Sequence, residues 1–213
     1  MIRIVIADDH AIVREGLKRI VSSAPDLEIV AEAGDGTEVM QVVRQHEFHV
    51  LVLDLSMPGR SGMELIRLVK AEQPRLRILV LSMHQEMQYA VRAIKSGASG
   101  YLTKESAPAQ LEQAIRKIAG GGAYISAEVA EQLALGAMPD GQAASHEALS
   151  DREFDVLRRL AAGASVSEIA AALKLSAKTV STHKANGMAK MRLANQSELV
   201  RYALKHGLID DVG

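Results

Sequence analysis

Five polar side chains each stand at the end of a short apolar run in the sequence: Asp8, Asp9, Asp54, Ser82 and Lys104. If these runs are neighbouring parallel strands, their carboxyl ends meet at one edge of a sheet and the five side chains share one cleft. Three carboxylates so close together cannot all stay ionised without a cation among them. Hard oxygen ligands suit Mg²⁺ better than a softer metal, so we expect Asp8, Asp9 and Asp54 to bind Mg²⁺.

The same residues suit the transfer of a phosphoryl group. The carboxylate of Asp54 is ionised at neutral pH, so it can attack a phosphoryl donor without a general base. Mg²⁺ and Lys104 would neutralise the oxygens of the transferring group, and Ser82 would donate a hydrogen bond to one of them. The expected product is an aspartyl phosphate. Ser56 and His84, two residues after Asp54 and Ser82, are placed to influence the water that hydrolyses it.

The elements that must position these residues alternate between strand and helix. Apolar runs predict strands at 2–7, 27–31, 49–54, 78–81 and 100–103. A segment with apolar residues at helical spacing follows each strand, and Pro25, Pro74 and Gly97 end three of these helices. Five such units predict an α/β domain over residues 1–120, with a five-stranded, doubly wound parallel sheet and helices on both faces.

The remaining sequence predicts a linker and an all-α domain. Residues 121–147 read as a flexible tether with one short helix, capped by Ser126. Residues 148–213 predict four helices, the first two opened by capping boxes at 150–153 and 165–168, the third capped by Ser176. A short helix, a tight turn and a longer basic helix are typical of a helix-turn-helix.

The charge of the chain is unevenly distributed. Residues 1–147 carry 15 Lys/Arg and 19 Asp/Glu, whereas residues 148–213 carry 10 Lys/Arg and 7 Asp/Glu, and the segment 174–192 has five basic residues and no acidic one. Such a local basic segment favours double-stranded DNA as the partner of the C-terminal domain. Its third helix would contact phosphates and base edges through Lys178, Thr179, Ser181, Thr182, Lys184, Ala185 and Asn186.

The last helix, from Ser197 to His206, repeats apolar residues at helical spacing. A domain of about sixty residues leaves part of such a face uncovered, so we expect Leu199, Val200 and Ala203 to form a dimer contact. A homodimer would place two DNA-reading helices on one symmetric site.

The composition indicates an intracellular protein. The chain has no cysteine, which excludes disulfides and thiolate metal sites and favours a reducing compartment. No apolar run reaches the roughly 18 residues that a membrane span needs. We therefore expect a cytoplasmic protein with no membrane partner.

Residues 2–119 resemble the receiver domain of bacterial two-component response regulators, which has a flavodoxin-like fold. The resemblance rests on Asp8-Asp9, Asp54 with Met57-Pro58-Gly59, Ser82 and Lys104. It implies that a phosphohistidine of a partner sensor histidine kinase is the phosphoryl donor and that Asp54 is the acceptor.

The resemblance also implies individual roles around the acceptor. Asp9 and Asp54 would bind Mg²⁺ directly, Asp8 would act partly through water, and the backbone carbonyl of Ser56 would complete the ligand set. Tyr101, three residues before Lys104, matches the aromatic switch of the family, which turns inward as the hydroxyl residue of the site moves toward the phosphoryl group.

Residues 148–207 resemble the LuxR-type helix-turn-helix, so the whole chain resembles a NarL/FixJ-type response regulator. This implies a transcription regulator that catalyses only its own phosphorylation and dephosphorylation. Gly187 departs from the family, which usually has a large apolar residue there, and glycine within a helix costs about 1 kcal/mol relative to alanine. The matching motifs are Leu149-Ser150, Arg152-Glu153, Val156-Leu157, Ala162-Gly163, Glu168-Ile169-Ala170, Leu175-Ser176, Lys178-Thr179-Val180 and Thr182-His183.

Two other functions stay open at this point. The first is a phosphorylation-independent dimeric transcription factor that uses the receiver as an interaction module, which the intact set of five residues disfavours. The second is a Mg²⁺-dependent phosphatase or related hydrolase, for which the sequence shows no second catalytic acid and no substrate-pocket insertion. An active Asp54→Asn variant would favour the first, and single-turnover labelling of Asp54 would exclude the second.

Overall fold

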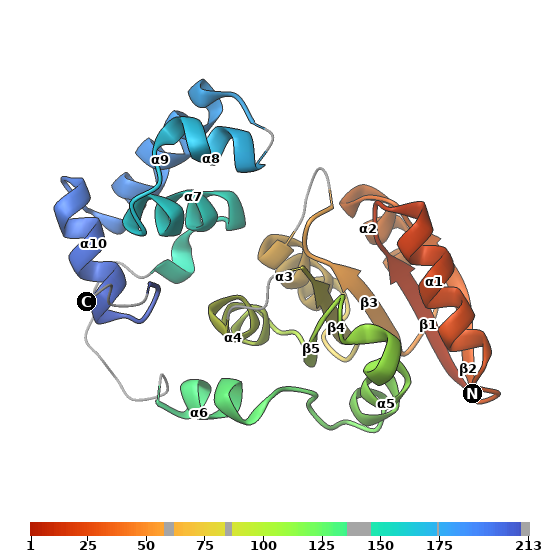
Figure 1. The fold of residues 1–213 in the computed structure, drawn as a ribbon. Helices are drawn as coiled ribbons and strands as arrows, with labels where there is room; N and C mark the ends of the chain where they lie inside the picture. The colour runs from red at the N-terminus through yellow and green to blue at the C-terminus, as the bar shows by residue number, and fades with distance from the viewer. Residues whose placement is uncertain (58–61, 84–86, 136–145, 174, 210–213) are drawn as a thin grey trace. The chain divides into compact units, whose positions relative to one another are not determined.

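A computed structural model describes residues 1–57, 62–83, 87–135, 146–173 and 175–209 (Figure 1). The chain divides into two compact units, Met1–Met138 and Pro139–Gly213, which are described separately. The strands are β1 (Ile2–Ala7), β2 (Leu27–Ala33), β3 (Val50–Asp54), β4 (Arg77–Ser82) and β5 (Gly100–Thr103). The helices of the first unit are α1 (Ala11–Ser22), α2 (Gly36–Gln45), α3 (Gly62–Glu72), α4 (Met87–Lys95), α5 (Ala107–Ala119) and α6 (Ala127–Leu135).

All five strands of the first unit are parallel and follow the order β2-β1-β3-β4-β5. This confirms the predicted doubly wound sheet, because the chain adds β2 on one side of β1 and then β3, β4 and β5 on the other side. The register places Asp54 opposite Leu81, and Ser82 opposite Thr103. The carboxyl ends of β3, β4 and β5 are therefore aligned, and the residues that end them lie at one edge.

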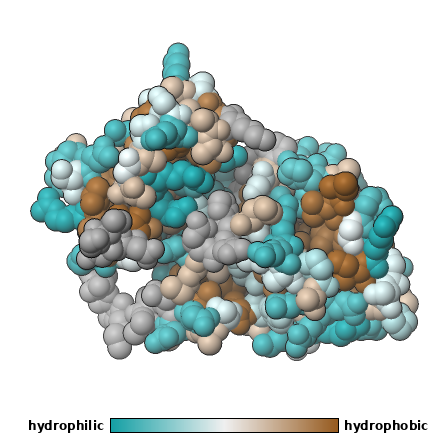
Figure 2. Space-filling model, in the orientation of Figure 1, coloured by the Kyte–Doolittle hydropathy of each residue, from teal (hydrophilic) through white to brown (hydrophobic). Residues whose placement is uncertain are grey.

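The strands are apolar on both sides because helices cover both faces of the sheet. Successive residues of β3 belong alternately to two apolar layers: Leu51 and Leu53 pack on one side, Val50 and Val52 on the other. Helices α2, α3 and α4 cover the first side, and α1 and α5 cover the second (Figure 1). Hydrophilic side chains predominate on the visible surface in Figure 2, as expected for layers that are enclosed.

The predicted tether differs from the structure over its first half. The backbone N–H of Tyr101 donates to the carbonyl of Tyr124 at 2.9 Å, and Tyr124 N–H donates to the carbonyl of Ser99 at 3.1 Å. Tyr124 thus pairs with the free edge of β5, an edge that proteins usually cover. Helix α6 packs on α4 with Val129 buried, and Ser126 caps it as predicted. Residues 121–135 therefore belong to the first unit.

The second unit is helical, as predicted. It consists of a 3₁₀ turn (His146–Ala148) and the helices α7 (Asp151–Ala161), α8 (Val166–Leu173), α9 (Ala177–Met191) and α10 (Gln196–Lys205). The predicted caps are confirmed: Ser150 and Glu153 form a reciprocal capping box, Ser165 and Glu168 exchange the same pair of hydrogen bonds, and the Ser176 hydroxyl accepts from the Thr179 N–H.

The structure corrects the prediction for α10. Leu199 is 3% exposed and Ala203 is fully buried, so both side chains lie in the core of the second unit, where α10 packs on α7. They are not available for a dimer contact, because a domain this small needs nearly every inward apolar residue for its own core. Val200 is partly exposed, and Leu204 is 39% exposed.

Gly187 has a packing role that the sequence did not indicate. It is buried where α9 crosses α7, and a Cβ atom built on it would lie 2.8 Å from Cδ1 of Leu157. The leucine occupies the space that a side chain at position 187 would fill. Among the residues that the structure describes, no helix is long and apolar enough to cross a membrane.

We predict that Gly100→Ala destabilises the first unit, whereas Gly16→Ala stabilises it. A Cβ at Gly100 would lie 3.0 Å from Cδ1 of Leu79 and 3.1 Å from both Cβ and O of Tyr124, which amounts to overpacking and costs about 1–3 kcal/mol. A Cβ at Gly16, an exposed residue of α1, meets nothing within 4 Å, so alanine gains up to about 1 kcal/mol of helix propensity. Urea unfolding followed by circular dichroism measures both, and equal stabilities of the two variants would contradict the edge pairing.

Candidate functional site

Asp54 ends β3 and is completely buried. Its two oxygens have separate partners: Oδ1 accepts a hydrogen bond from the backbone N–H of Ser56 at 3.1 Å, and Oδ2 accepts one from Nζ of Lys104 at 2.8 Å. An uncompensated buried carboxylate is costly, so this pairing offsets the cost of placing Asp54 at the sheet edge.

Lys104 reaches Asp54 because the turn after β5 is fixed by hydrogen bonds. Its backbone N–H donates to the carbonyl of Ser82 at 2.8 Å, and the hydroxyls of Thr103 and Ser106 lie 2.9 Å apart within the turn. The ammonium also lies 2.7 Å from Oδ2 of Asp8, so one lysine joins the ends of β1 and β3. The predicted lysine thus contacts two of the three predicted carboxylates directly.

The third carboxylate, Asp9, is partly exposed and belongs to the turn between β1 and α1. Two residues of this region were missed by the sequence reasoning. His10 lies with Nδ1 2.9 Å from Oδ1 of Asp9, and Arg14 donates from Nη1 to the backbone carbonyl of Asp8 at 2.6 Å. The position of His10 directly after the acidic pair was the signal that could have found it. Arg14 lies a full helical turn further along the chain, and its position in the sequence gave no such signal.

The electrostatics of the cluster favour an added cation. Burial raises the pKa of Asp54 above its usual range, although the hydrogen bond from Lys104 acts in the opposite direction. Burial also disfavours the charged form of Lys104, but its hydrogen bonds to Asp54 and Asp8 outweigh this and raise the pKa of the ammonium. A divalent cation beside the carboxylates would favour the ionised form of Asp54 and so act against the effect of burial.

The donor atoms fit a small divalent ion. One ligand atom from each of Asp8, Asp9, His10 and Asp54 can be chosen so that all of them lie within 4.8 Å of one another. Two ligands on opposite sides of Mg²⁺ would be about 4.2 Å apart, so a slight contraction around the ion suffices. Since Lys104 contacts Oδ2 of both Asp8 and Asp54, the Oδ1 atoms remain for the metal.

The other predicted residues occupy the expected positions along the chain. Ser82 ends β4 and is completely buried, one residue beyond the strand partner of Asp54. Tyr101, in β5, is partly exposed and lines a cavity of about 640 Å³ with Met87, Ala90 and Val129. His84, like Pro58 and Gly59 of the predicted turn, lies outside the described residues.

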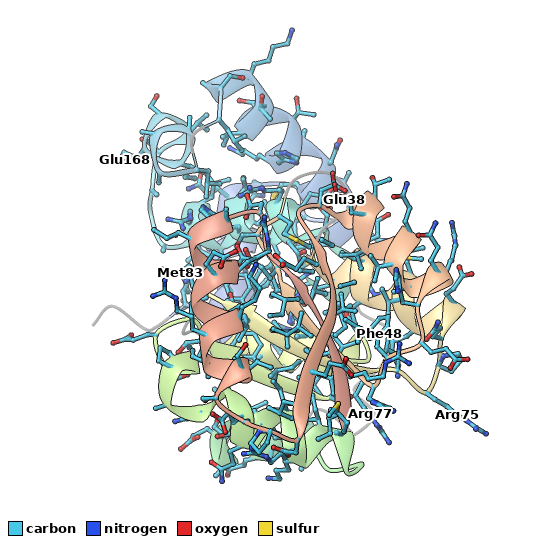
Figure 3. The ribbon with its side chains drawn as sticks, turned by 90° about the vertical axis from the view of Figure 1, so that its right-hand side faces the viewer. Glu38, Phe48, Arg75, Arg77, Met83 and Glu168 are labelled. Atoms are coloured by element: carbon cyan, nitrogen blue, oxygen red, sulfur yellow. The ribbon has the colours of Figure 1, made fainter. Side chains whose placement is uncertain are left out.

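The two ends of the sheet differ in what they carry (Figure 3). Met83 directly follows Ser82 and lies at the upper end of the sheet in this view, the end at which the strands finish. Phe48, two residues before β3, and Arg77, the first residue of β4, lie below Met83 in this view. Because all five strands are parallel, every chemically active residue named above is confined to the Met83 end.

Helix α9 carries the predicted DNA-reading residues on one accessible face. Val180, Gly187 and Met191 of this helix are buried, whereas Met188 is partly exposed. Lys190 is engaged by Glu153, with Nζ 2.7 Å from Oε2, which joins α9 to α7. Of the seven predicted contact residues, Thr179 and Lys184 are partly exposed, and the other five are exposed: Lys178, Ser181, Thr182, Ala185 and Asn186.

Family models match both units. Residues 4–116 match the response regulator receiver domain, and residues 147–203 match the bacterial regulatory proteins of the luxR family. The chain is 32% identical to the response regulator UvrY of Escherichia coli K12, over 98% of this chain and 96% of UvrY. It is 39% identical to the oxygen regulatory protein NreC of Staphylococcus carnosus, over 98% of this chain and 99% of NreC.

Solved structures agree with these matches. RcsB of Salmonella enterica serovar Typhimurium, bound to the promoter rprA in the presence of the phosphomimetic BeF₃⁻, is similar with a TM-score of 0.60 at 30% identity, covering 94% of this chain and 97% of RcsB. A structure of two RcsB dimers bound to two parallel DNAs is similar with a TM-score of 0.58 at 31% identity, covering 94% and 96%. The chain therefore belongs to the NarL/FixJ-type two-component response regulators, DNA-binding transcription regulators with a receiver domain and a LuxR-type helix-turn-helix domain.

Proposed function

We propose that Asp54 is the phosphoryl acceptor of this regulator and that a sensor histidine kinase supplies the group. The observation that carries the proposal is the double contact of the Lys104 ammonium with Asp54 and Asp8, at 2.8 and 2.7 Å, inside a buried sheet edge. A lysine held in this way can contact an oxygen of an incoming phosphoryl group without moving far. Two exposed apolar side chains, Ile12 and Met83, stand close in sequence to the site and suit a protein donor.

The reaction follows from the contacts of Asp54. A carboxylate oxygen of Asp54 attacks phosphorus, a new O–P bond forms, and the bond from phosphorus to the donor nitrogen breaks with its electron pair staying on nitrogen. Lys104 compensates charge on a phosphoryl oxygen, and the Ser82 hydroxyl donates to another. When bound, Mg²⁺ would supply further neutralisation, held by Asp8, Asp9 and Asp54 with the Ser56 carbonyl. Later attack of water on phosphorus restores Asp54 and releases phosphate.

We further propose that phosphorylation controls dimerisation and DNA binding. RcsB, a relative with both domains, has been solved with DNA and a phosphomimetic, which supports coupling between the receiver and the helical domain. Tyr101 is the proposed switch because it lines the cavity beside α4 and its backbone is bound to Tyr124 at the start of the linker. We propose three functional segments: the receiver domain at 1–120, the linker at 121–147 and the DNA-binding domain at 148–213. The first half of this linker packs on the receiver.

The proposed DNA contacts are the α9 residues Lys178, Thr179, Ser181, Thr182, Lys184, Ala185 and Asn186. Their support is the accessible basic face of α9, in which Lys190 is partly neutralised by Glu153, leaving Lys178 and Lys184 for phosphates. For the dimer contact we now propose Val200 with Leu204, in place of the buried Leu199 and Ala203. We propose a cytoplasmic location because a promoter-binding regulator works where its DNA is.

We predict that acetyl phosphate with Mg²⁺ adds one phosphoryl group to the wild-type protein and none to Asp54→Asn. Lys104→Gln and Asp9→Asn should reduce labelling strongly, because they remove charge compensation and a metal ligand. Glu28→Gln is the matched control, since it removes an exposed carboxylate of β2 away from the site. Intact-mass spectrometry reads the product.

Labelling of Asp54→Asn to the wild-type level would overturn the proposal. An Asp54→Asn variant that dimerises and binds DNA like the phosphorylated wild type would instead support the phosphorylation-independent alternative.

We predict that Lys184→Ala weakens binding to duplex DNA about equally for all sequences and reduces the slope of log K against log salt by about 1, because one phosphate contact is lost. Lys205→Ala, an exposed lysine at the end of α10, is the control and should leave the slope unchanged. Fluorescence anisotropy at several salt concentrations, with duplexes selected from a random pool, gives the slopes. Equal slopes for both variants and the wild type would contradict the α9 interface.

A further inference from the structure

His10 borders the acidic cluster on its solvent side, opposite Lys104. Its ring nitrogen Nδ1 lies 2.9 Å from Oδ1 of Asp9 and 3.4 Å from Oδ1 of Asp8, while its backbone N–H donates to Oδ1 of Asp8 at 2.8 Å. The side chain is 61% exposed, against 1% for Asp8. The imidazole thus stands where an ion entering from solvent would meet the carboxylates.

Helix capping does not account for this position of the ring. His10 occupies the N-cap position of α1 with extended backbone dihedrals, φ −93° and ψ 105°, but its side chain makes no capping hydrogen bond. If the His10 side chain capped α1, its Nδ1 would point toward the backbone amides of the first helical turn. Instead, the ring turns toward the two carboxylates.

The two basic side chains of the site differ in what they offer a metal. Lys104 contacts Oδ2 of Asp8 and of Asp54, and an ammonium has no lone pair with which to bind a cation. Neutral imidazole does have one, and the nitrogen of His10 lies within 4.8 Å of a ligand oxygen on each of Asp8, Asp9 and Asp54. Lys104 excludes ions from its side of the cluster, whereas His10 can bind one.

We propose that His10 is a nitrogen ligand at this site for divalent cations that accept imidazole, and that it gives the site a preference for such cations that the carboxylates alone would not provide. The proposal rests on the metal centre of the proposed function. Mg²⁺ takes oxygen ligands and holds its waters, so it gains little from imidazole. Ions such as Ni²⁺ bind imidazole well, and the site combines that nitrogen with carboxylate oxygens.

The test compares Mg²⁺ and Ni²⁺ binding to the intact protein by isothermal titration calorimetry. In His10→Gln, Ni²⁺ affinity should fall at least about tenfold, as expected for a lost metal contact, while Mg²⁺ affinity stays within about twofold. The chain has seven histidines, so His46→Gln serves as the matched control, because His46 is exposed at the end of α2. Asp9→Asn should weaken both ions.

A second readout does not depend on affinity. In protein labelled with ¹⁵N-histidine, sub-stoichiometric Ni²⁺ should broaden the ring signals of His10 first, and Asp9→Asn should abolish this order. Failure of the wild type to bind Mg²⁺ would overturn the proposed metal centre itself. Mg²⁺ binding together with equal effects of His10→Gln on both ions, or broadening of another histidine first, would overturn the role of His10 alone.

Discussion

The receiver depends on one buried arrangement of charges: the ammonium of Lys104 between the carboxylates of Asp54 and Asp8. Neither carboxylate could be held at an apolar sheet edge without a partner, since breaking a buried ion pair typically costs several kcal/mol. The parallel sheet makes the arrangement possible, because strands β1, β3 and β5 all end at the same edge. The surplus of negative charge that remains is the physical basis for the cation proposed at this site.

The rest of the first unit positions these three residues. The backbone N–H of Ser56 donates to Asp54, which fixes the turn after β3 at the site. The backbone N–H of Lys104 donates to the carbonyl of Ser82, which fixes the turn after β5 in the same way. On the far side of β5, Tyr101 bonds through its backbone to Tyr124, whose segment leads into α6. A displacement of β5 or Tyr101 would therefore also displace Tyr124, at the beginning of the linker. This gives the proposed switch a physical route that does not require a long flexible tether.

Much of this could be predicted from the sequence, because strong local signals agreed with the fold. Strands β3 and β4 are largely continuous apolar runs, and the caps at Ser150, Ser165 and Ser176 are formed by residues whose side chains accept hydrogen bonds from free backbone amides. What could not be predicted depends on tertiary contacts. Periodicity marks Leu199 and Ala203 as apolar but does not tell whether their partner is α7 or a second chain. Likewise, the fit of Gly187 against Leu157 and the pairing of Tyr124 with β5 involve residues distant in sequence.

Asp54 is a buried carboxylate whose negative charge is only partly compensated by Lys104. The most direct measurement is the pKa of its side chain, followed by carboxyl ¹³C NMR with and without Mg²⁺. We expect a pKa above the usual range for aspartate in the metal-free protein, because burial dominates, and a marked decrease of this pKa when Mg²⁺ is added, because a cation favours the ionised form. An ordinary aspartate pKa that does not respond to Mg²⁺ would contradict this description of Asp54.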